Sequence, residues 1–366
     1  MIDAELVREI EPQLECAYQE HMDSIGDKRP ISPIATLARA ADTEPDPIEY
    51  GEVLRDKHEG HVTAIAEELG VDLRPVLAST FFVNLLTEDN LPHYTSRIHS
   101  KVFASPALMT FTNEWTAEED THGRLMLDYA LFAGIIGTHD ARLIEVADYE
   151  AGRVSQLRAG TEINPASLQD AFAYLPLQEL LTKDAHNASR WLMGQAGAIV
   201  MNPIIGDEQN HYEFYRKAFE AALEADPDGS LVSMANLYKL RGNGHFEMPG
   251  RQGIPNFENH AAVIGLSGIF DLETIARAKQ TIVKKTGVET VQPTTDEGKQ
   301  AQAKILALTS AEAVAEQAET MESFRDSKPT TLDNGLLPFV LGKTVDFTYS
   351  GAPGHERITG LQAVAV

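Results

Sequence analysis

The sequence predicts an all-α protein, and three observations agree on this class. Apolar residues recur at three- and four-residue spacing from about residue 50 to 325, strand-like alternation is scarce there, and capping signals precede expected helices. With 43% hydrophobic residues among 366, the chain can bury a sizeable core. Helices are expected near 74–101, 105–133, 167–190, 197–225, 230–241, 256–269, 271–286 and 296–325, with a shorter one after Thr138.

Local signals indicate where these helices begin and end. Ser105 followed by Pro106 is a cap and first turn, and the Asp-Pro-Asp-Gly run at 226–229 marks a turn between two helices. After Pro329 glycines punctuate short runs, which predicts a short irregular or β-rich C-terminal tail. The predicted organisation is an N-terminal segment over 1–50, a helical domain over 51–326 and a tail over 327–366.

Charge and composition exclude several functions. A net charge of -25 opposes binding to a phosphate backbone, so nucleic acid is not an expected partner. The apolar runs are shorter than the roughly 20 residues that span a bilayer, so the chain is not expected to be membrane-spanning. The only cysteine, Cys16, excludes a disulfide framework and a self-contained iron-sulfur centre. With no secretory signal pattern, a cytoplasmic location is expected.

Two short motifs carry the chemistry. Of the twelve histidines, only His122 and His211 follow a glutamate by three residues, Glu119 and Glu208 respectively. A single such pair is usually a surface ion pair. Here each pair lies within the largely apolar face of its helix, and a buried carboxylate without a partner costs several kcal/mol, roughly. Both placements therefore predict a compensating positive charge.

The same two-helix unit occurs twice in the chain. Glu88 precedes Glu119 by 31 residues and Glu179 precedes Glu208 by 29, each within an apolar stripe of its own helix. A glutamate on one helix and a Glu-x-x-His on the next, repeated, is the pattern of di-iron and di-manganese carboxylate bundles. Four carboxylates and two neutral imidazoles balance two divalent ions, and this donor set suits iron or manganese better than structural zinc. We therefore predict a ferritin-like four-helix bundle with extra flanking helices.

Other residues surround this predicted centre. Asp207 is expected to reach the second ring nitrogen of His122. Thr182, one turn after Glu179, is expected either to face the oxygen-binding side as a proton relay or to bond back to its own helix. Pro92 removes a backbone donor near Glu88 and predicts a bend there.

The segments that carry these residues resemble the soluble acyl-carrier-protein desaturases, most closely the actinobacterial type. The likeness covers roughly residues 50 to 325 and is carried by TEDNLP at 87–92, EWTAEE at 114–119 with His122-Gly123, Gln178-Glu179, Asp207-Glu208 with His211, HFEMPG at 245–250 and, more weakly, EGKQAQ at 297–302. By this resemblance the four glutamates and two histidines bind two irons, Asp207 supports a ligand and Thr182 relays protons.

The resemblance implies an oxygen-dependent acyl-[acyl-carrier-protein] desaturase that introduces a cis double bond, takes electrons from a ferredoxin-type donor and forms a homodimer. It also has departures: residues 25 to 50 lack the tryptophan usual there, which leaves the electron route open. Because acyl carrier protein is acidic, docking requires a basic patch. The candidates on one helix are Arg277, Lys279, Lys284 and Lys285.

Several alternatives remain open from the sequence. The acyl donor could be coenzyme A, or activity could have been lost. The bundle also occurs in other di-iron oxygenases, in radical-generating reductase subunits and in iron-storage proteins. A scaffold that binds acyl chains or iron without turnover is the non-enzymatic alternative.

Overall fold

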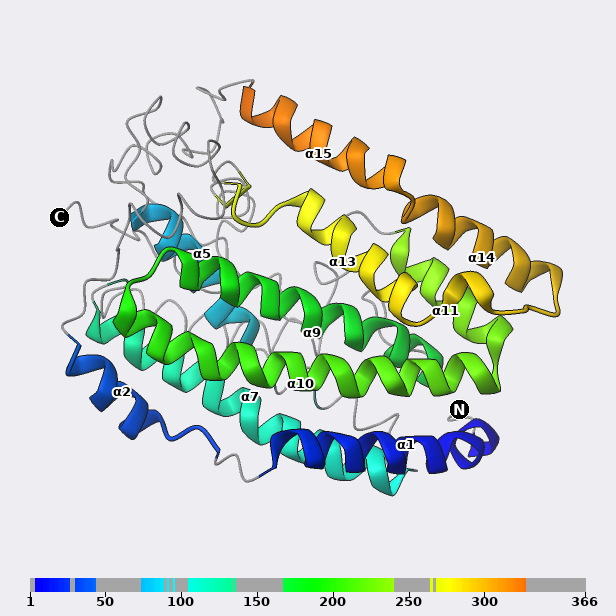
Figure 1. Ribbon diagram of the computed structural model, residues 1–366, viewed down its shortest axis with the longest axis horizontal. Coiled ribbons are helices and arrows are strands. Elements are labelled where there is room, and N and C mark those ends of the chain that lie inside the picture. The colour runs from blue at the N-terminus through cyan, green and yellow to red at the C-terminus, as the bar shows by residue number, and fades with distance from the viewer. Residues whose placement is uncertain are drawn as a thin grey trace, which may run out of the picture.

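All regular elements in the part of the chain that the computed structural model describes are helical (Figure 1). That part comprises residues 4–26, 30–43, 74–88, 91, 95, 105–133, 135, 167–239, 264–265 and 268–326. The predicted all-α class is confirmed within it. The helices are α1 (Ala4–Ile25), α2 (Pro33–Ala41), α5 (Arg74–Glu88), α7 (Pro106–Phe132), α9 (Leu168–Trp191), α10 (Gln195–Ala225), α11 (Pro227–Tyr238), α13 (Leu272–Lys285), the 3-10 helix η3 (Val288–Thr290), α14 (Asp296–Leu308) and α15 (Ala311–Asp326).

Some sequence predictions fall outside the described residues. They are the short helix after Thr138, most of the helix at 256–269, the bend at Pro92, the boundary at residue 50 and the tail over 327–366. Among the described helices, none is long and apolar enough to cross a membrane.

Four helices form the central bundle. In a closed ring of contacts, α5 packs on α7, α7 on α10, α10 on α9, and α9 on α5. The connection between α9 and α10 is only three residues long, so the two helices run antiparallel as neighbours, and they lie side by side in Figure 1. This arrangement agrees with the predicted ferritin-like four-helix bundle.

Flanking helices cover two sides of the bundle. On one side α1 and α2 pack against α7 and α10, and on the other α11 and α13 pack against α9, with α14 and α15 beyond them (Figure 1). Helix α1 belongs to the main apolar core, because Leu6, Ile10 and Leu14 are buried within it. Neither α1 nor α2 was among the helices expected from the apolar spacing.

Capping residues fix the helix limits where the sequence placed them. The Ser105 hydroxyl accepts a hydrogen bond from the Leu108 N–H at 3.1 Å, and Pro106 occupies the first turn of α7. Asp226 ends α10 and caps α11, accepting a hydrogen bond from the Gly229 N–H at 3.0 Å. The predicted cap at Ser105 is confirmed. The predicted turn at 226–229 is shorter in the structure, because Pro227 and the two residues after it already form the first turn of α11.

The single helix predicted at 296–325 is wrong, because the structure has two helices there. Helix α14 ends at Leu308, and Ser310 caps α15 by accepting a hydrogen bond from the Ala313 N–H at 3.1 Å. The Thr309 hydroxyl instead returns to the Ile305 carbonyl. Apolar periodicity continues through this break, so spacing alone does not detect it.

The apolar core consists of two clusters that lie one after the other along the bundle. On α7, Phe111 and Trp115 belong to the first cluster, whereas Met126 and Tyr129 belong to the second. Helices α9 and α10 also contribute to both clusters. On α7 and α10 the residues between the two clusters include the polar ones discussed below, so a polar layer lies between two apolar clusters.

Candidate metal centre

The six side chains singled out from the sequence lie together in the polar layer of the bundle. Each is buried, with at most 6% of its surface exposed. They come from all four bundle helices: Glu88 from α5, Glu119 and His122 from α7, Glu179 from α9, and Glu208 and His211 from α10. Because the two Glu-x-x-His pairs are on adjacent helices, one turn of each helix is enough to bring four donors together.

These donors form two overlapping groups, which we call site 1 and site 2. In each group one atom per residue lies within 4.8 Å of the others, a spacing that a single metal ion can satisfy. Site 1 contains Glu88, Glu119, His122 and Glu208. Site 2 contains Glu119, Glu179, Glu208 and His211.

Glu119 and Glu208 each present one oxygen to each site. Oε1 of Glu208 lies 3.2 Å from Nδ1 of His122, and Oε2 lies 3.9 Å from Nδ1 of His211. For Glu119, Oε2 lies 3.4 Å from Nδ1 of His122, and Oε1 lies 3.1 Å from Nδ1 of His211. Both carboxylates are therefore placed to bridge two metal ions, while Glu88 and Glu179 belong to one site each.

A crossed pair of hydrogen bonds orients the two histidines. Nε2 of His122 on α7 lies 3.3 Å from Asp207 on α10, and Nε2 of His211 on α10 lies 2.8 Å from Glu118 on α7. A proton donated from Nε2 to a carboxylate leaves the lone pair of Nδ1 facing the cluster. The predicted contact of Asp207 with His122 is present, whereas Glu118 was not predicted, although an acidic residue precedes the glutamate of both motifs.

A third buried histidine, His186, was also missed. It lies on α9, and its Nε2 is 2.9 Å from Oε1 of Glu88 and 3.8 Å from Oε1 of Glu208. Burial lowers the pKa of His186 to about 4, so its ring is neutral near pH 7. The signal in the sequence is weak: His186 follows Glu179 by seven residues, or two helical turns on one face.

The electrostatics of the metal-free cluster divide its members into two kinds. Burial, followed by neighbouring carboxylates, raises the pKa of Glu88 well above its usual value, and burial does the same for Glu179. For Glu119 and Glu208, burial acts in the same direction, but the close approach of both histidines outweighs it and lowers the pKa.

The two histidines complete this pattern. Burial lowers the pKa of His122 and His211, but their carboxylate partners outweigh burial and raise both well above the usual value. Without metal, two protonated glutamates, two ionised glutamates and two imidazolium rings sum to zero charge. Two divalent ions with four carboxylates and two neutral imidazoles also sum to zero.

The buried donor atoms fit a metal better than they fit one another. Nδ1 of His122, Nδ1 of His211 and both oxygens of Glu208 are buried and face the cluster, and none of them has a well-directed hydrogen bond with another described residue. Buried polar atoms are normally paired, because an unpaired one costs about 1–3 kcal/mol. Carboxylate oxygens with imidazole nitrogens are a donor set that suits a divalent transition metal. The cluster could therefore hold metal ions.

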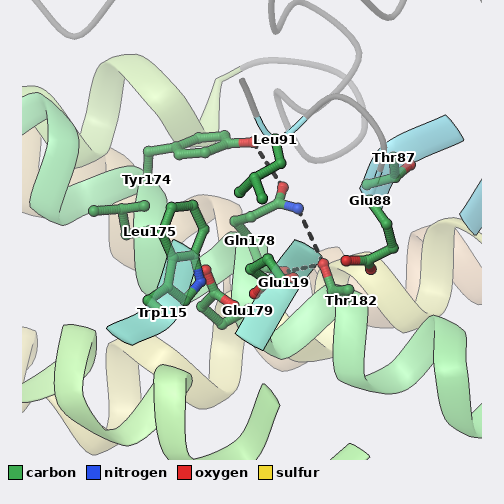
Figure 2. Close-up of a pocket in the computed structure, with 10 residues that line it drawn as sticks. All are labelled: Thr87, Glu88, Leu91, Trp115, Glu119, Tyr174, Leu175, Gln178, Glu179 and Thr182. Atoms are coloured by element: carbon green, nitrogen blue, oxygen red, sulfur yellow. Dashed lines mark hydrogen bonds between the residues drawn. The ribbon is translucent and has the colours of Figure 1, made fainter. Parts of the chain in front are cut away.

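A pocket opens beside the cluster (Figure 2). The space between its walls, open solvent included, is about 370 Å³, and carboxylates of both sites contribute to its lining. The residues that add apolar surface to its walls are Leu91, Trp115, Tyr174 and Leu175. The pocket therefore lies against both candidate sites, and part of its wall is apolar.

A chain of hydrogen bonds follows one wall of this pocket. Figure 2 shows Tyr174, Gln178 and Thr182 in line: the tyrosine hydroxyl donates to Oε1 of Gln178 at 2.6 Å, and Nε2 of Gln178 donates to the Thr182 hydroxyl at 3.0 Å. Thr182 in turn donates to the Gln178 carbonyl at 3.0 Å. Thr182 thus lines the pocket and bonds back to its own helix, and its role as a proton relay stays a prediction.

A four-helix bundle with two inward Glu-x-x-His pairs and two further glutamates defines the di-metal carboxylate class of proteins. Residues 7–333 match the family model described as fatty acid desaturase, and the chain belongs to this family. The match begins within α1, upstream of the roughly 50–325 covered by the sequence motifs.

Named relatives agree with this family. DesA1 of Mycobacterium tuberculosis, provisionally named an acyl-[acyl-carrier-protein] desaturase, is 31% identical over 51% of this chain. The chain covers about half of that relative, 54% of its length. The chloroplastic stearoyl-[acyl-carrier-protein] 9-desaturase of Spinacia oleracea is 29% identical over 74% of this chain and 68% of its own length. The acyl-[acyl-carrier-protein] 6-desaturase of Thunbergia alata is 28% identical over 60% and 58%, respectively.

Proposed function

We propose that this protein is an oxygen-dependent acyl-[acyl-carrier-protein] desaturase that introduces a cis double bond into a saturated fatty acyl chain. Two irons would be held at sites 1 and 2, and a ferredoxin-type donor would supply the electrons. The observation that carries the proposal is that Glu119 and Glu208 belong to both donor groups, in a chain of the fatty acid desaturase family.

The iron pair would supply the oxidising power needed to remove two hydrogens from an unactivated chain, with dioxygen reduced to water. The protein positions the ligands and keeps water out of the cluster. Asp207 and Glu118 hold the histidine rings with Nδ1 inward, and the apolar clusters above and below the polar layer exclude water. Thr182, placed in the pocket wall and bonded to Gln178, would hold and pass a proton at its hydroxyl.

The acyl chain would reach the cluster at this pocket. Its walls at Leu91, Trp115 and Leu175 provide apolar contact, and its polar face carries Glu88 and Glu179. A methylene chain lying against the apolar wall would pass beside both metal sites, which lie on the same pocket.

Acyl carrier protein is the proposed carrier because the relatives are named for it, and a homodimer is proposed from the family resemblance. The basic patch expected on α13 needs correction. Lys279 is only 7% exposed, its ammonium lies 5.6 Å from the Tyr238 ring centre, and burial lowers its pKa to about 8. Of the four candidates, Lys279 cannot contact a partner, whereas Lys284 and Lys285 are exposed.

The proposed function is tested by turnover with defined donors. Protein loaded anaerobically with iron is mixed with stearoyl or palmitoyl carrier-protein thioesters, reduced ferredoxin and oxygen. The expected product has lost two hydrogens by mass spectrometry and contains one cis double bond. Coenzyme A thioesters serve as the alternative donor. Two bound irons with no product from any donor would refute the desaturase and favour iron storage or acyl binding.

Substitution of the two outer carboxylates should affect the two sites separately. Asp207→Asn removes the negative charge of the group that accepts from His122 of site 1, and Glu118→Gln removes the charge of the group that accepts from His211 of site 2. Each change is expected to reduce the affinity for one metal ion by about 10- to 100-fold, which is the usual effect of losing a histidine's carboxylate partner. Cobalt titration followed calorimetrically measures both affinities. If both variants weakened the same ion, the crossed arrangement would be wrong.

A further inference from the structure

The two metal sites differ in how their non-bridging glutamates are supported. Glu88 of site 1 contacts His186 at 2.9 Å. Oε1 of Glu179 in site 2 is buried and has no hydrogen-bond donor among the described residues. The internal repeat thus makes the six ligands symmetric, but the residues that contact Glu88 and Glu179 do not follow the same symmetry.

The proton of His186 is placed by its other neighbour. Nδ1 of His186 lies 3.4 Å from Nδ2 of Asn84, which also donates to the Ser189 hydroxyl at 3.0 Å. An amide nitrogen is only a donor, so Nδ1 must accept, and the single proton of a neutral ring must then be on Nε2. That nitrogen faces Oε1 of Glu88, so the carboxylate is the acceptor of this hydrogen bond.

The four members of this network are buried and come from two packed helices. Asn84 and Glu88 are one turn apart on α5, and His186 and Ser189 are on α9. Asn84 and Glu88 are 6% and 5% exposed, and the other two are fully buried. A buried network in which these donors have acceptors fixes the orientation of the His186 ring and of the Glu88 carboxylate that the ring contacts.

We propose that His186 is a positioning residue that makes the two metal sites unequal: by donating to Oε1 of Glu88 it fixes the orientation of that carboxylate at site 1, whereas no described residue donates to Oε1 of Glu179 at site 2. The proposal rests on the proposed dimetal function. It implies that the Glu88 carboxylate would keep one orientation, whereas the Glu179 carboxylate, which shares the pocket with Thr182, would be able to change its orientation.

The test is a cobalt titration of the metal-free full-length protein, followed by calorimetry and by the visible absorption of bound cobalt. His186→Leu removes the donor, and His186→Gln retains a side-chain amide donor. The matched control is His21→Leu, since His21 is also a buried histidine but packs against Phe111, outside the ligand cluster. Glu88→Ala provides the absorption spectrum of an ion held at site 2 alone.

We expect His186→Leu to reduce the affinity for one ion about 10- to 100-fold and to leave the affinity for the other ion within about threefold of wild type. The ion that remains tightly bound should have the absorption spectrum seen in Glu88→Ala. His186→Gln should recover most of the affinity, and His21→Leu should resemble wild type. Unchanged affinities in His186→Leu, equal weakening of both ions, or a glutamine variant as weak as leucine would overturn the proposal. If the wild-type protein itself failed to bind two ions, the dimetal centre would fail instead.

Discussion

Glu208→Gln should abolish binding of both metal ions, whereas Glu179→Gln should abolish binding of only one. Glu208 presents one oxygen to His122 and the other to His211, and it belongs to both sites. Glu179 belongs to site 2 alone. Glutamine has nearly the shape of glutamate but carries no negative charge, so each substitution removes a ligand charge without opening a cavity. A difference in metal content between the two variants would therefore show that Glu208 serves both sites, and it would not arise from a difference in side-chain burial.

The expected size of the Glu208→Gln effect is large. Loss of a residue that only supports a ligand typically reduces metal affinity or activity by about 10- to 100-fold. Loss of a carboxylate shared by two ions should exceed this, so desaturase activity is expected to fall by at least about 100-fold. Iron per chain, measured by mass spectrometry after anaerobic loading, should be below one for Glu208→Gln and near one for Glu179→Gln.

Glu213→Gln is the control for this pair. Glu213 lies on the same helix as Glu208, but its side chain is 42% exposed and pairs with Arg216. Its substitution should leave two irons per chain and full activity. If Glu208→Gln retained one ion with undiminished affinity, Glu208 would be a ligand of a single site and the bridging geometry would be rejected.

The ligands could be predicted from sequence because helical geometry makes them local. A separation of three residues places Glu119 and His122 on one helix face, and the same relation holds for Glu208 and His211. The repeat then identifies Glu88 and Glu179 without knowledge of how the helices pack. The cap at Ser105 is local in the same sense, since it depends on a hydroxyl and an N–H three residues away.

The features missed depend on how helices are rotated against one another. Glu118 contacts His211, and His186 contacts Glu88, across two different helix interfaces. No spacing along one helix encodes such a contact. Lys279 was misplaced for the same reason, because its burial arises from packing against Tyr238 of α11. Sequence periodicity describes a face, whereas the neighbouring helix decides what covers it.

Loading the metal-free protein is expected to release protons, up to about four for two ions. The raised pKa values of Glu88, Glu179, His122 and His211 mean that the metal-free cluster holds protons on these groups, and ligands bind metal only after losing them. Two divalent ions would replace four protons at constant net charge. With two protons leaving per ion, metal affinity should rise by up to about 100-fold per pH unit.

The same exchange gives the sign of the stability change with pH. A raised pKa in the folded metal-free protein stabilises it fully below the unfolded value, about 4.3 for glutamate and 6.5 for histidine, and this contribution is lost as the pH rises through the raised pKa. The metal-loaded protein no longer carries these protons. The increase in melting temperature on adding metal should therefore grow from pH 6 to pH 8. His186, with its pKa lowered to about 4, is neutral in both states across this range and does not contribute to the difference.

Proton release is measured with an indicator dye in weakly buffered solution during cobalt titration, at several pH values. Glu179→Gln should release at least one proton fewer in total, because it lacks one of the protonated carboxyls and binds one ion. A metal affinity that does not change between pH 6 and 8, or release of less than one proton per ion at the lower end, would mean that the buried carboxyls of the metal-free protein are already ionised. The negative charge of four buried glutamates in the metal-free protein would then have to be compensated by groups other than these protons.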